Sequence, residues 1–205
     1  MAWNLGALKS VVLENDLVRL RRLSFQDKAG YARIAFDPDI WRYFVSVLET
    51  EDDLDAYIEQ AVHDWLAGTR LVFTIVDRHS GRIAGGTAFG NLSPRDLRLE
   101  IGWSWVGREF VRSGVNRAAK ALLLDYAFGT LECERVEFKT DVLNVAARRG
   151  LEGIGATEEG TLRSFNVMPG GRRRDAVYYS ILRGEWPAIR SSRFGAEHLP
   201  RRPGP

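Results

Sequence analysis

The stretch from Glu100 to Phe128, EIGWSWVGREFVRSGVNRAAKALLLDYAF, contains the features that decide the fold. Its first part belongs to an alternating pattern in which one set of positions is apolar and the other polar or small: Leu97, Leu99, Ile101, Trp103 and Trp105 against Arg98, Glu100, Gly102 and Ser104. A period of two predicts a β-strand over 97–106, with the apolar set facing the core. From about Gly114 to Leu131 the apolar spacing becomes helical, so a strand leads through a glycine-containing turn into a helix.

The start of this helix carries cations where helices usually favour acids. Arg112, Arg117 and Lys120 lie near the positive end of the helix dipole, and no acidic residue accompanies them. A glycine-containing loop that leads into a helix presents free N–H groups and binds anions. We therefore expect a phosphate site here, although a basic helix start in contact with solvent explains the local pattern equally well.

The composition is that of a soluble globular protein: 205 residues, 45% hydrophobic, 27% charged and a net charge of +2. This charge does not demand a nucleic-acid or membrane partner, and no apolar run approaches the ~20 residues that span a bilayer. The single cysteine, Cys133, excludes an intramolecular disulfide. Since the first residues also lack the pattern of a signal peptide, we expect a cytoplasmic location.

The remaining segments predict a single α/β domain of the α+β type. Strands are expected at 17–23, 70–77, 82–92, 134–140 and in two stretches joined by PGGRRR, and helices in TEDDLDAYIEQAVHDWLAG and NVAARRGLEGIG. This order favours a mixed, mostly antiparallel sheet of about seven strands flanked by helices. We place the domain at residues 1–190 and expect the polar, proline-rich residues 191–205 to form a mobile tail.

Several kinds of chemistry lack their usual signals in this sequence. There is no GxxxxGK[ST] loop, no GxGxxG after a strand and no G-x-S-x-G turn, which argues against a P-loop hydrolase, a dinucleotide fold and a serine hydrolase. His63 and His79 have no second ligand at a metal-binding spacing, so no metal site is expected. Cys133 is expected to be a small buried or edge residue rather than a nucleophile.

A second stretch, ERVEFKTDVLNVAARRGLEGIGATEEGTLR from Glu134 to Arg163, makes the pattern specific. Together with the opening stretch it resembles the GNAT superfamily of acyl-CoA-dependent N-acyltransferases, and most nearly its RimJ/RimL-like branch. The resemblance extends over roughly residues 16–187. It implies a GNAT-like central sheet, acetyl-CoA as the cofactor, and an amine acceptor that is either a peptide N-terminus or a small molecule.

The resemblance also implies where the cofactor binds. In the family a Q/R-x-x-G-x-G/A loop holds the CoA pyrophosphate through main-chain N–H groups, and here it corresponds to residues 111–116. Gly114 fits the pattern, whereas Val111 and Asn116 depart from it. The implied cofactor-binding residues are Trp103, Ser104, Trp105 and Val106 on the strand, Arg112, Ser113, Gly114, Val115, Asn116 and Arg117 at the helix start, and Asn144.

Glu100 is the candidate catalytic base by the same resemblance, since an ammonium group must lose a proton before it can attack. The alternative is a structural carboxylate that pairs with Arg98 or with a neighbouring strand. In the family the next helix opens with Asn and carries Ser three residues later. Here Asn144 is kept but Ala147 replaces the Ser, so water, Ser104, Tyr178 or no group at all protonates the leaving thiolate.

Two other functions remain open at this point. One is a non-catalytic acyl-CoA-binding module on the same fold, which the departures at Val111 and Ala147 favour. The other is a basic nucleic-acid-binding domain, against which the nearly neutral charge argues. We expect neither a nucleic-acid nor a membrane partner and leave a homodimer open.

Two further groups of residues have alternative interpretations. Trp41, Tyr43 and Phe44 could line an acceptor pocket or belong to the core. The run Arg172 to Arg174, at a predicted hairpin tip, could be a solvated turn or could contact an acidic acceptor or a partner subunit.

Overall fold

The computed structural model describes Trp3 and residues 10–195. Its strands are β1 (Leu13–Glu14), β2 (Val18–Arg22), β3 (Leu71–Asp77), β4 (Ile83–Ser93), β5 (Arg98–Val106), β6 (Arg135–Asp141), β7 (Thr157–Val167) and β8 (Arg173–Leu182). Its α-helices are α2 (Lys28–Ala32), α3 (Pro38–Trp41), α4 (Glu51–Ala67), α5 (Val115–Gly129), α6 (Val145–Gly153) and α7 (Trp186–Phe194). Short 3-10 turns occur at Phe25–Asp27, Arg108–Phe110 and Pro169–Gly171.

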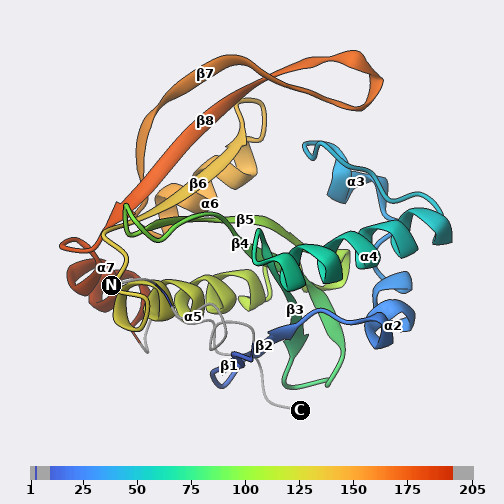
Figure 1. Cartoon of the computed structure of the whole chain (residues 1–205), viewed down its shortest axis with the longest axis horizontal. Helices are drawn as coiled ribbons and strands as arrows, with labels where there is room; N and C mark the ends of the chain where they lie inside the picture. Colours follow the sequence, from blue (N-terminus) through green and yellow to red (C-terminus); the bar gives the residue numbers. More distant parts are fainter. Residues whose placement is uncertain (1–2, 4–9, 196–205) are drawn as a thin grey trace.

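The strands form one eight-stranded sheet in the order β1-β2-β3-β4-β5-β6-β8-β7. Of these pairings only β5 with β6 is parallel. Figure 1 shows α5 below β4 and β5, while β6, β8 and β7 curve away above them. The predicted α/β domain with a mixed, mostly antiparallel sheet is thus confirmed, and the additional strand is the two-residue β1, which pairs with β2.

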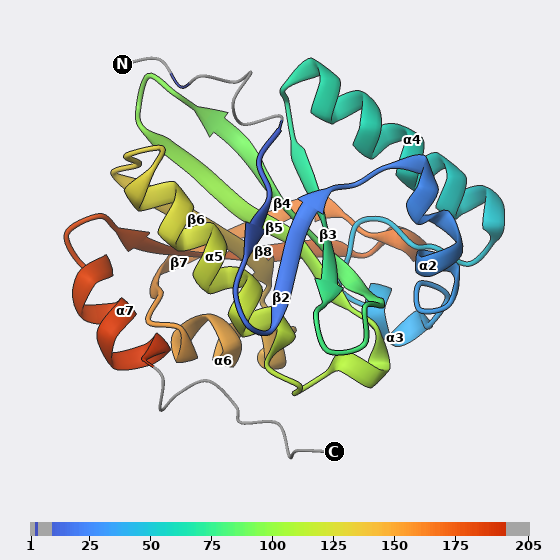
Figure 2. The same cartoon turned by 90° about the horizontal axis from the view of Figure 1, so that it is seen from below.

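Two hydrophobic clusters lie on the two faces of the sheet. The first packs α5 and α7 against the strands and includes Leu123, Leu124 and Phe138. The second packs α4 and the α2–α3 region against the other face and includes Ile58 and Trp41. Figure 2 shows α7 at one end of the molecule and α4 with α2 at the other, with α5 lying between them. In the described part of the chain, no helix is long and apolar enough to cross a membrane.

The parallel pair β5–β6 is short, and its two strands then separate. They pair at three positions: Arg98 with Arg135, Leu99 with Val136, and Glu100 with Glu137. Beyond Glu100, β5 stays paired with β4 on its other side, and β6 stays paired with β8 as far as Asp141. The two strands therefore diverge in the middle of the sheet. A continuous parallel pair would have kept their main chains hydrogen-bonded to each other there.

The prediction of a single apolar face on β5 is wrong beyond Ile101. Trp103 has a positive φ of +51°, and the register with β4 shifts where Thr87 lies between Gly86 and Ala88. Such a bulge adds one residue to the strand and reverses the faces of the residues that follow. Consequently Leu99 and Ile101 pack on the α5 side, whereas Trp105 packs on the α4 side.

The predicted boundary at residue 190 is also wrong. Helix α7 continues to Phe194, whose side chain is only 1% exposed and whose ring centroid lies 5.5 Å from that of Trp186. Residues 191–194 are therefore part of the folded domain, because an apolar anchor at the end of the helix fixes them. The rest of the predicted tail, residues 196–205, lies outside the described residues.

The reversed face of β5 gives a first prediction. Trp105 is buried against Tyr31 and Trp41, with ring centroids 5.4 and 5.1 Å away. We expect Trp105→Ala to lower the free energy of unfolding by about 3–5 kcal/mol, the usual loss for a large aromatic core residue. Trp103→Ala, at a half-buried site, should cost clearly less. Chemical denaturation of both variants measures this, and equal losses would contradict the reversal.

Candidate active site

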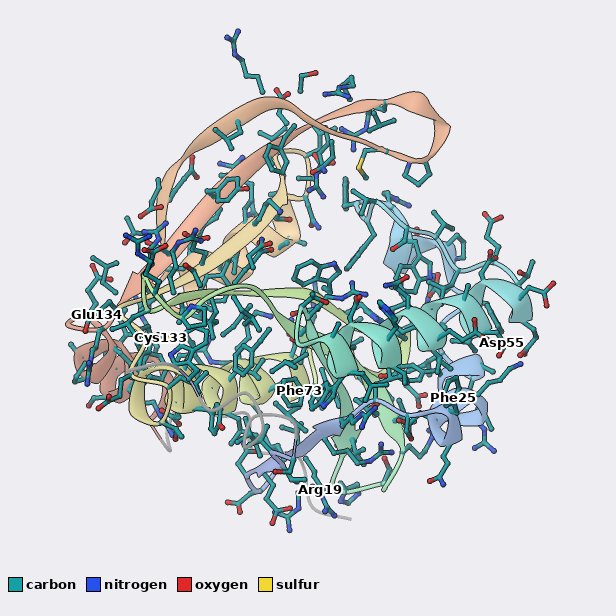
Figure 3. All side chains as sticks on the ribbon, viewed as in Figure 1. Arg19, Phe25, Asp55, Phe73, Cys133 and Glu134 are labelled. Carbon is teal, nitrogen blue, oxygen red and sulfur yellow. The ribbon has the colours of Figure 1, made fainter. Side chains whose placement is uncertain are left out.

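A cleft of about 1050 Å³ is lined by both diverging strands. Residues from β5, the turn before α5, α5 itself, β6, α6, the segment between α3 and α4, and the β7–β8 hairpin form its walls. In Figure 3, the labelled residues Cys133 and Glu134 mark the end at which β5 and β6 are paired; the strands diverge away from that end. Cys133 does not line the cleft, and burial raises the pKa of its thiol to about 12.

Most of the site residues expected from the sequence meet in this cleft. They are Glu100, Trp103, Ser104, Val106, Arg112, Gly114, Asn116, Arg117 and Asn144. Trp105, Ser113 and Val115 do not line it. Trp105 and Val115 are core residues, and the Ser113 hydroxyl donates to the Phe110 carbonyl at 2.7 Å. The side chains of these three residues are engaged elsewhere, so the prediction that they bind the cofactor rests on their main-chain groups.

The first turn of α5 presents main-chain donors at the cleft. Gly114 is the N-cap with a φ of +87°, which glycine adopts without strain, and no side chain caps the helix. The N–H groups of Gly114, Asn116 and Arg117 have no acceptor among the described residues, and that of Val115 has only a long contact of 3.4 Å to the Ser113 hydroxyl. An uncapped helix start with free N–H groups is suited to an anion.

The three cations at this helix start have different surroundings. Arg112 is exposed, has a positive φ of +61° and forms no ion pair with a described residue. Lys120 is half-buried and donates to the Asn116 Oδ1 at 2.8 Å, and burial lowers the pKa of its amine to about 8. Arg117 instead donates to the carbonyls of Gly153 and Arg193, so its guanidinium connects α5 to α6 and α7.

Glu100 lies where the two strands separate, and the residue is 3% exposed. Its Oε2 accepts a hydrogen bond from Asn91 Nδ2 at 2.6 Å and lies 3.5 Å from Lys139 Nζ. Its Oε1 accepts no hydrogen bond from the described residues and sits against Gly102, where an added Cβ would be 2.8 Å away. Gly102 therefore leaves room for the unbonded carboxylate oxygen.

Burial dominates the electrostatics of this carboxylate. Desolvation raises the pKa of Glu100, while Lys139 and Asn91 act in the opposite direction and offset part of the shift. Arg98 does not pair with Glu100; it lies 3.6 Å from Glu137 instead. The expected alternative, a pairing with a neighbouring strand, is present through Lys139, but it engages only one of the two oxygens.

The charge of the cleft is strongly unbalanced. Six cationic side chains line it: Arg112, Arg117, Lys120, Lys139, Arg149 and Arg174. Among the described residues Glu100 is the one acidic side chain in the lining. This excess of positive charge, together with the free N–H groups of α5, favours an anionic ligand.

Comparisons with known proteins agree with this geometry. The sequence family described as "Acetyltransferase (GNAT) domain" matches residues 18–157. The chain belongs to the GNAT acetyltransferases. It is 33% identical to YdaF of Bacillus subtilis (strain 168), which carries the provisional name of a ribosomal N-acetyltransferase, over 83% of this chain and 88% of that protein.

Two further relatives extend the comparison. The N-acetyltransferase p20 of Bacillus licheniformis, which is uncharacterized, is 26% identical over 85% of this chain and 97% of its own length. The crystal structure of a GCN5-related N-acetyltransferase from Brucella melitensis superposes with a TM-score of 0.81 at 27% identity, covering 88% of this chain and 82% of that one. The protein is therefore an acyltransferase of the GNAT fold, and the name of YdaF agrees with the RimJ/RimL-like branch.

Within this GNAT domain, five polar residues near Glu100 or in the cleft escaped the sequence analysis: Asn91, Lys139, Thr140, Arg149 and Asn166. A signal for Lys139 was present, because the alternation in ERVEFKT places it opposite the buried Val136 and Phe138. Asn91 and Asn166 come from other strands, and no local pattern relates them to Glu100. Of the aromatic candidates, Tyr43 and Phe44 line the cleft, whereas Trp41 is a core residue.

The side chains considered as proton donors to the thiolate differ in whether they line the cleft and in whether they are free to donate. Ala147 lines the cleft without a hydroxyl. Ser104 lines the cleft, but its hydroxyl bonds with Thr87 Oγ1 at 2.8 Å and donates to the Gly102 carbonyl at 3.3 Å. Tyr178 does not line the cleft, and burial raises the pKa of its phenol. In the described part of the chain, no three His, Cys, Asp or Glu side chains are grouped as metal ligands.

The lowered pKa of Lys120 gives a second prediction. The folded protein releases this proton near pH 8, whereas the unfolded chain keeps it up to about pH 10.5. The buried charge therefore lowers stability below pH 8, and this cost disappears as the pH rises from 8 to 10.5. We expect Lys120→Met to raise the free energy of unfolding by about 1 kcal/mol at pH 7, after allowance for partial solvent screening.

Denaturation of the wild type and Lys120→Met at pH 7 and pH 10, without acetyl-CoA, measures this difference. At pH 10 the two proteins should approach each other in stability. Arg112→Met is the matched control, because it removes an exposed cation from the same helix start and should leave the free energy of unfolding unchanged. A Lys120→Met protein that is less stable at pH 7 would show that this lysine holds the helix start together.

Proposed function

We propose that the protein transfers the acetyl group of acetyl-CoA to a primary amine, by direct attack of the amine within a ternary complex. The observation that carries the proposal is Glu100: a buried carboxylate at the point where β5 and β6 separate, with one oxygen fixed and the other unbonded beside Gly102. The cleft also holds the free N–H groups at the start of α5.

The residues present suit the CoA moiety. The free N–H groups of Gly114, Asn116 and Arg117 would hold its pyrophosphate, with Arg112 and Lys120 as neighbouring cations. The departures at Val111 and Asn116 do not remove these donors, because the donors belong to the main chain. The Oδ1 of Asn144 accepts from the Ala147 N–H at 3.0 Å, which leaves the amide nitrogen of this side chain available to a ligand.

In the proposed reaction the amine nitrogen forms a bond to the thioester carbonyl carbon, and the carbon–sulfur bond breaks to release the CoA thiolate. Glu100 Oε1 takes one proton from the incoming ammonium, directly or through water. The second N–H proton, which the nitrogen loses as the amide forms, passes through water to the thiolate. Lys139 and Asn91 keep the carboxylate in place through Oε2. Since the Ser104 hydroxyl is already engaged and Ala147 has none, water is the group best placed to protonate the thiolate.

The acceptor is a peptide N-terminus or a small-molecule amine. The provisional name of YdaF concerns a ribosomal acceptor, so ribosomal-protein N-terminal peptides belong in the acceptor screen. The rival function, an acyl-CoA-binding module without turnover, is favoured by the departures at Val111 and Ala147. An unbonded, buried carboxylate oxygen in the cleft argues for turnover, because binding alone gives no reason to keep such a group.

A third prediction tests the cofactor site. Gly114→Asp places a bulky anion where the pyrophosphate is proposed to lie, so acetyl-CoA should raise the melting temperature of the wild type and not of this variant. Gly171→Asp is the matched control, because Gly171 has a similar φ of +84° but lies between β7 and β8 and does not line the cleft. Equal thermal shifts in the wild type and Gly114→Asp would place the phosphates elsewhere.

A fourth prediction tests the base. Glu100→Gln should lower the turnover rate by about two orders of magnitude near neutral pH, a typical general-base contribution, with acetyl-CoA affinity changed by no more than a few-fold. In the wild type the rate should rise with pH through the raised pKa of Glu100, because the base must be ionised. The loss in the variant should shrink at higher pH, where more of the amine is already neutral.

A pH–rate profile of both proteins gives this measurement. Glu137→Gln is the control, because Glu137 is the register partner of Glu100 on β6 but does not line the cleft. Its rate should match the wild type within a few-fold. Full activity of Glu100→Gln at every pH would assign the proton transfer to water or to a residue outside β5.

A further inference from the structure

The three arginines of the run Arg172 to Arg174 have different surroundings. Arg172 forms an ion pair with the buried Asp141, and Arg173 is exposed and donates to the hydroxyl and carbonyl of Ser164. Arg174 is only 7% exposed and lines the cleft. The interpretation of this run as a solvated turn is therefore wrong for Arg174, and the alternative of a contact with an acidic acceptor stays open for it.

The Arg174 guanidinium is incompletely satisfied. Its Nη2 donates to Asn166 Oδ1 at 2.6 Å, and its Nε is buried without a partner. No carboxylate among the described residues lies within ion-pair distance of it. The two acids that influence it electrostatically, Asp141 and Glu100, already have cationic partners in Arg172 and Lys139.

A buried arginine without a carboxylate is costly for a fold, because the charge loses its hydration and gains no counter-charge. Burial lowers the pKa of Arg174 as well, which reflects the same loss of hydration. A guanidinium nevertheless keeps its charge in proteins. The folded protein thus maintains an uncompensated positive group at the wall of its cleft, and the missing counter-charge is the observation to be explained.

The position of Arg174 in the sheet indicates which substrate it faces. On β8, Val177 and Tyr179 belong to the cluster on the α5 side, so the alternate positions Arg174, Ala176 and Tyr178 face the other way. Tyr178 is the register partner of Lys139, whose amine reaches Glu100. Arg174 therefore lies on the same face of the sheet as the Glu100 carboxylate and on the face opposite α5.

We propose that the acceptor amine carries a carboxylate and that Arg174, with Asn166 beside it, binds this carboxylate. The inference rests on the proposed acetyl transfer. A guanidinium presents paired donors that match the two oxygens of a carboxylate, and the Asn166 amide nitrogen adds another donor next to them. Two kinds of acceptor supply this chemistry: a free amino acid through its α-carboxylate, and a peptide whose first or second side chain is Asp or Glu.

The test compares acceptors that differ only in the carboxylate. Wild-type protein saturated with acetyl-CoA is assayed for CoA release with alanine against alanine amide, and with peptides that begin Glu or Asp against peptides that begin Gln or Asn. A second peptide set makes the same exchange at the second position. We expect at least one carboxylate acceptor to exceed its amide twin in kcat/KM by on the order of 10- to 100-fold, mostly through KM, because the contact is made before and during the reaction.

Two variants and a control connect this preference to the residue. Arg174→Gln should remove the preference for the carboxylate while leaving the KM for acetyl-CoA within a few-fold, and Arg174→Lys should retain part of it. Arg173→Gln changes the neighbouring exposed arginine, which does not line the cleft, and should keep the full preference. The comparison of wild-type acceptors does not depend on the folding of any variant.

The outcomes separate this inference from the function on which it rests. If amines without a carboxylate, including the amide twins, are acetylated with the same kcat/KM as the carboxylate acceptors, the proposed carboxylate site is wrong and acetyl transfer stands. If Arg174→Gln weakens acetyl-CoA binding and leaves the acceptor preference unchanged, Arg174 serves the CoA moiety and the inference is again wrong. If the wild type acetylates no amine in the panel, both are overturned. Selectivity for the free amino acids or for the peptides identifies the source of the carboxylate.

Discussion

The separation of β5 from β6 is the constraint on which the rest of the structure depends. A parallel pair needs a crossover connection, and here α5 provides it between the two strands. The helix consequently begins near the carboxyl end of β5, where its free N–H groups reach the cleft. If β5 and β6 had remained paired to their ends, their main-chain N–H and C=O groups would bond to each other. No cleft would then open between the strands beside Glu100. The three paired positions hold β5 and β6 together at one end, and the divergence beyond them leaves the cleft between the two strands.

The charged side chains inside the cleft are paired differently from those outside it. Outside the cleft, cations mostly have acidic partners, as in the pairs Arg21–Asp27, Arg135–Glu159 and Arg190–Asp125. Inside it, six cations accompany one carboxylate among the described residues. A net charge of +2 for the chain therefore conceals a strongly positive cavity. Such an arrangement lowers the stability of the protein without ligand and favours binding of anionic substrates. The charge of the cleft is therefore more informative about function than the net charge of the chain.

Sequence patterns predicted the elements that rest on local interactions. The helix in TEDDLDAYIEQAVHDWLAG, which is α4, the helical spacing of α5 and the order of the strands along the chain all appear as expected. Sequence patterns gave wrong predictions where contacts between residues far apart in the chain determine the structure. A bulge opposite Thr87 moves Trp105 to the other face, and a contact with Trp186 extends α7 to Phe194. The cleft followed the same rule: Glu100 and Gly114 lie in one continuous stretch, whereas Lys139, Asn166 and Arg174 meet only through strand pairing.

In the proposed function, the two ends of the cleft use different means to hold negative charge. At the start of α5 the donors are main-chain N–H groups, which tolerate the departures at Val111 and Asn116 because any residue supplies them. At the β7–β8 hairpin the donor is one guanidinium, whose geometry no other side chain reproduces. If both proposals hold, recognition of a common cofactor can persist while the sequence changes, whereas recognition of the acceptor depends on single side chains. Between them lies Glu100, whose Oε1 stays unbonded because Asn91 and Lys139 both engage Oε2. The chemistry of the site thus depends on an asymmetry within one carboxylate, which neither neighbouring strand would produce alone.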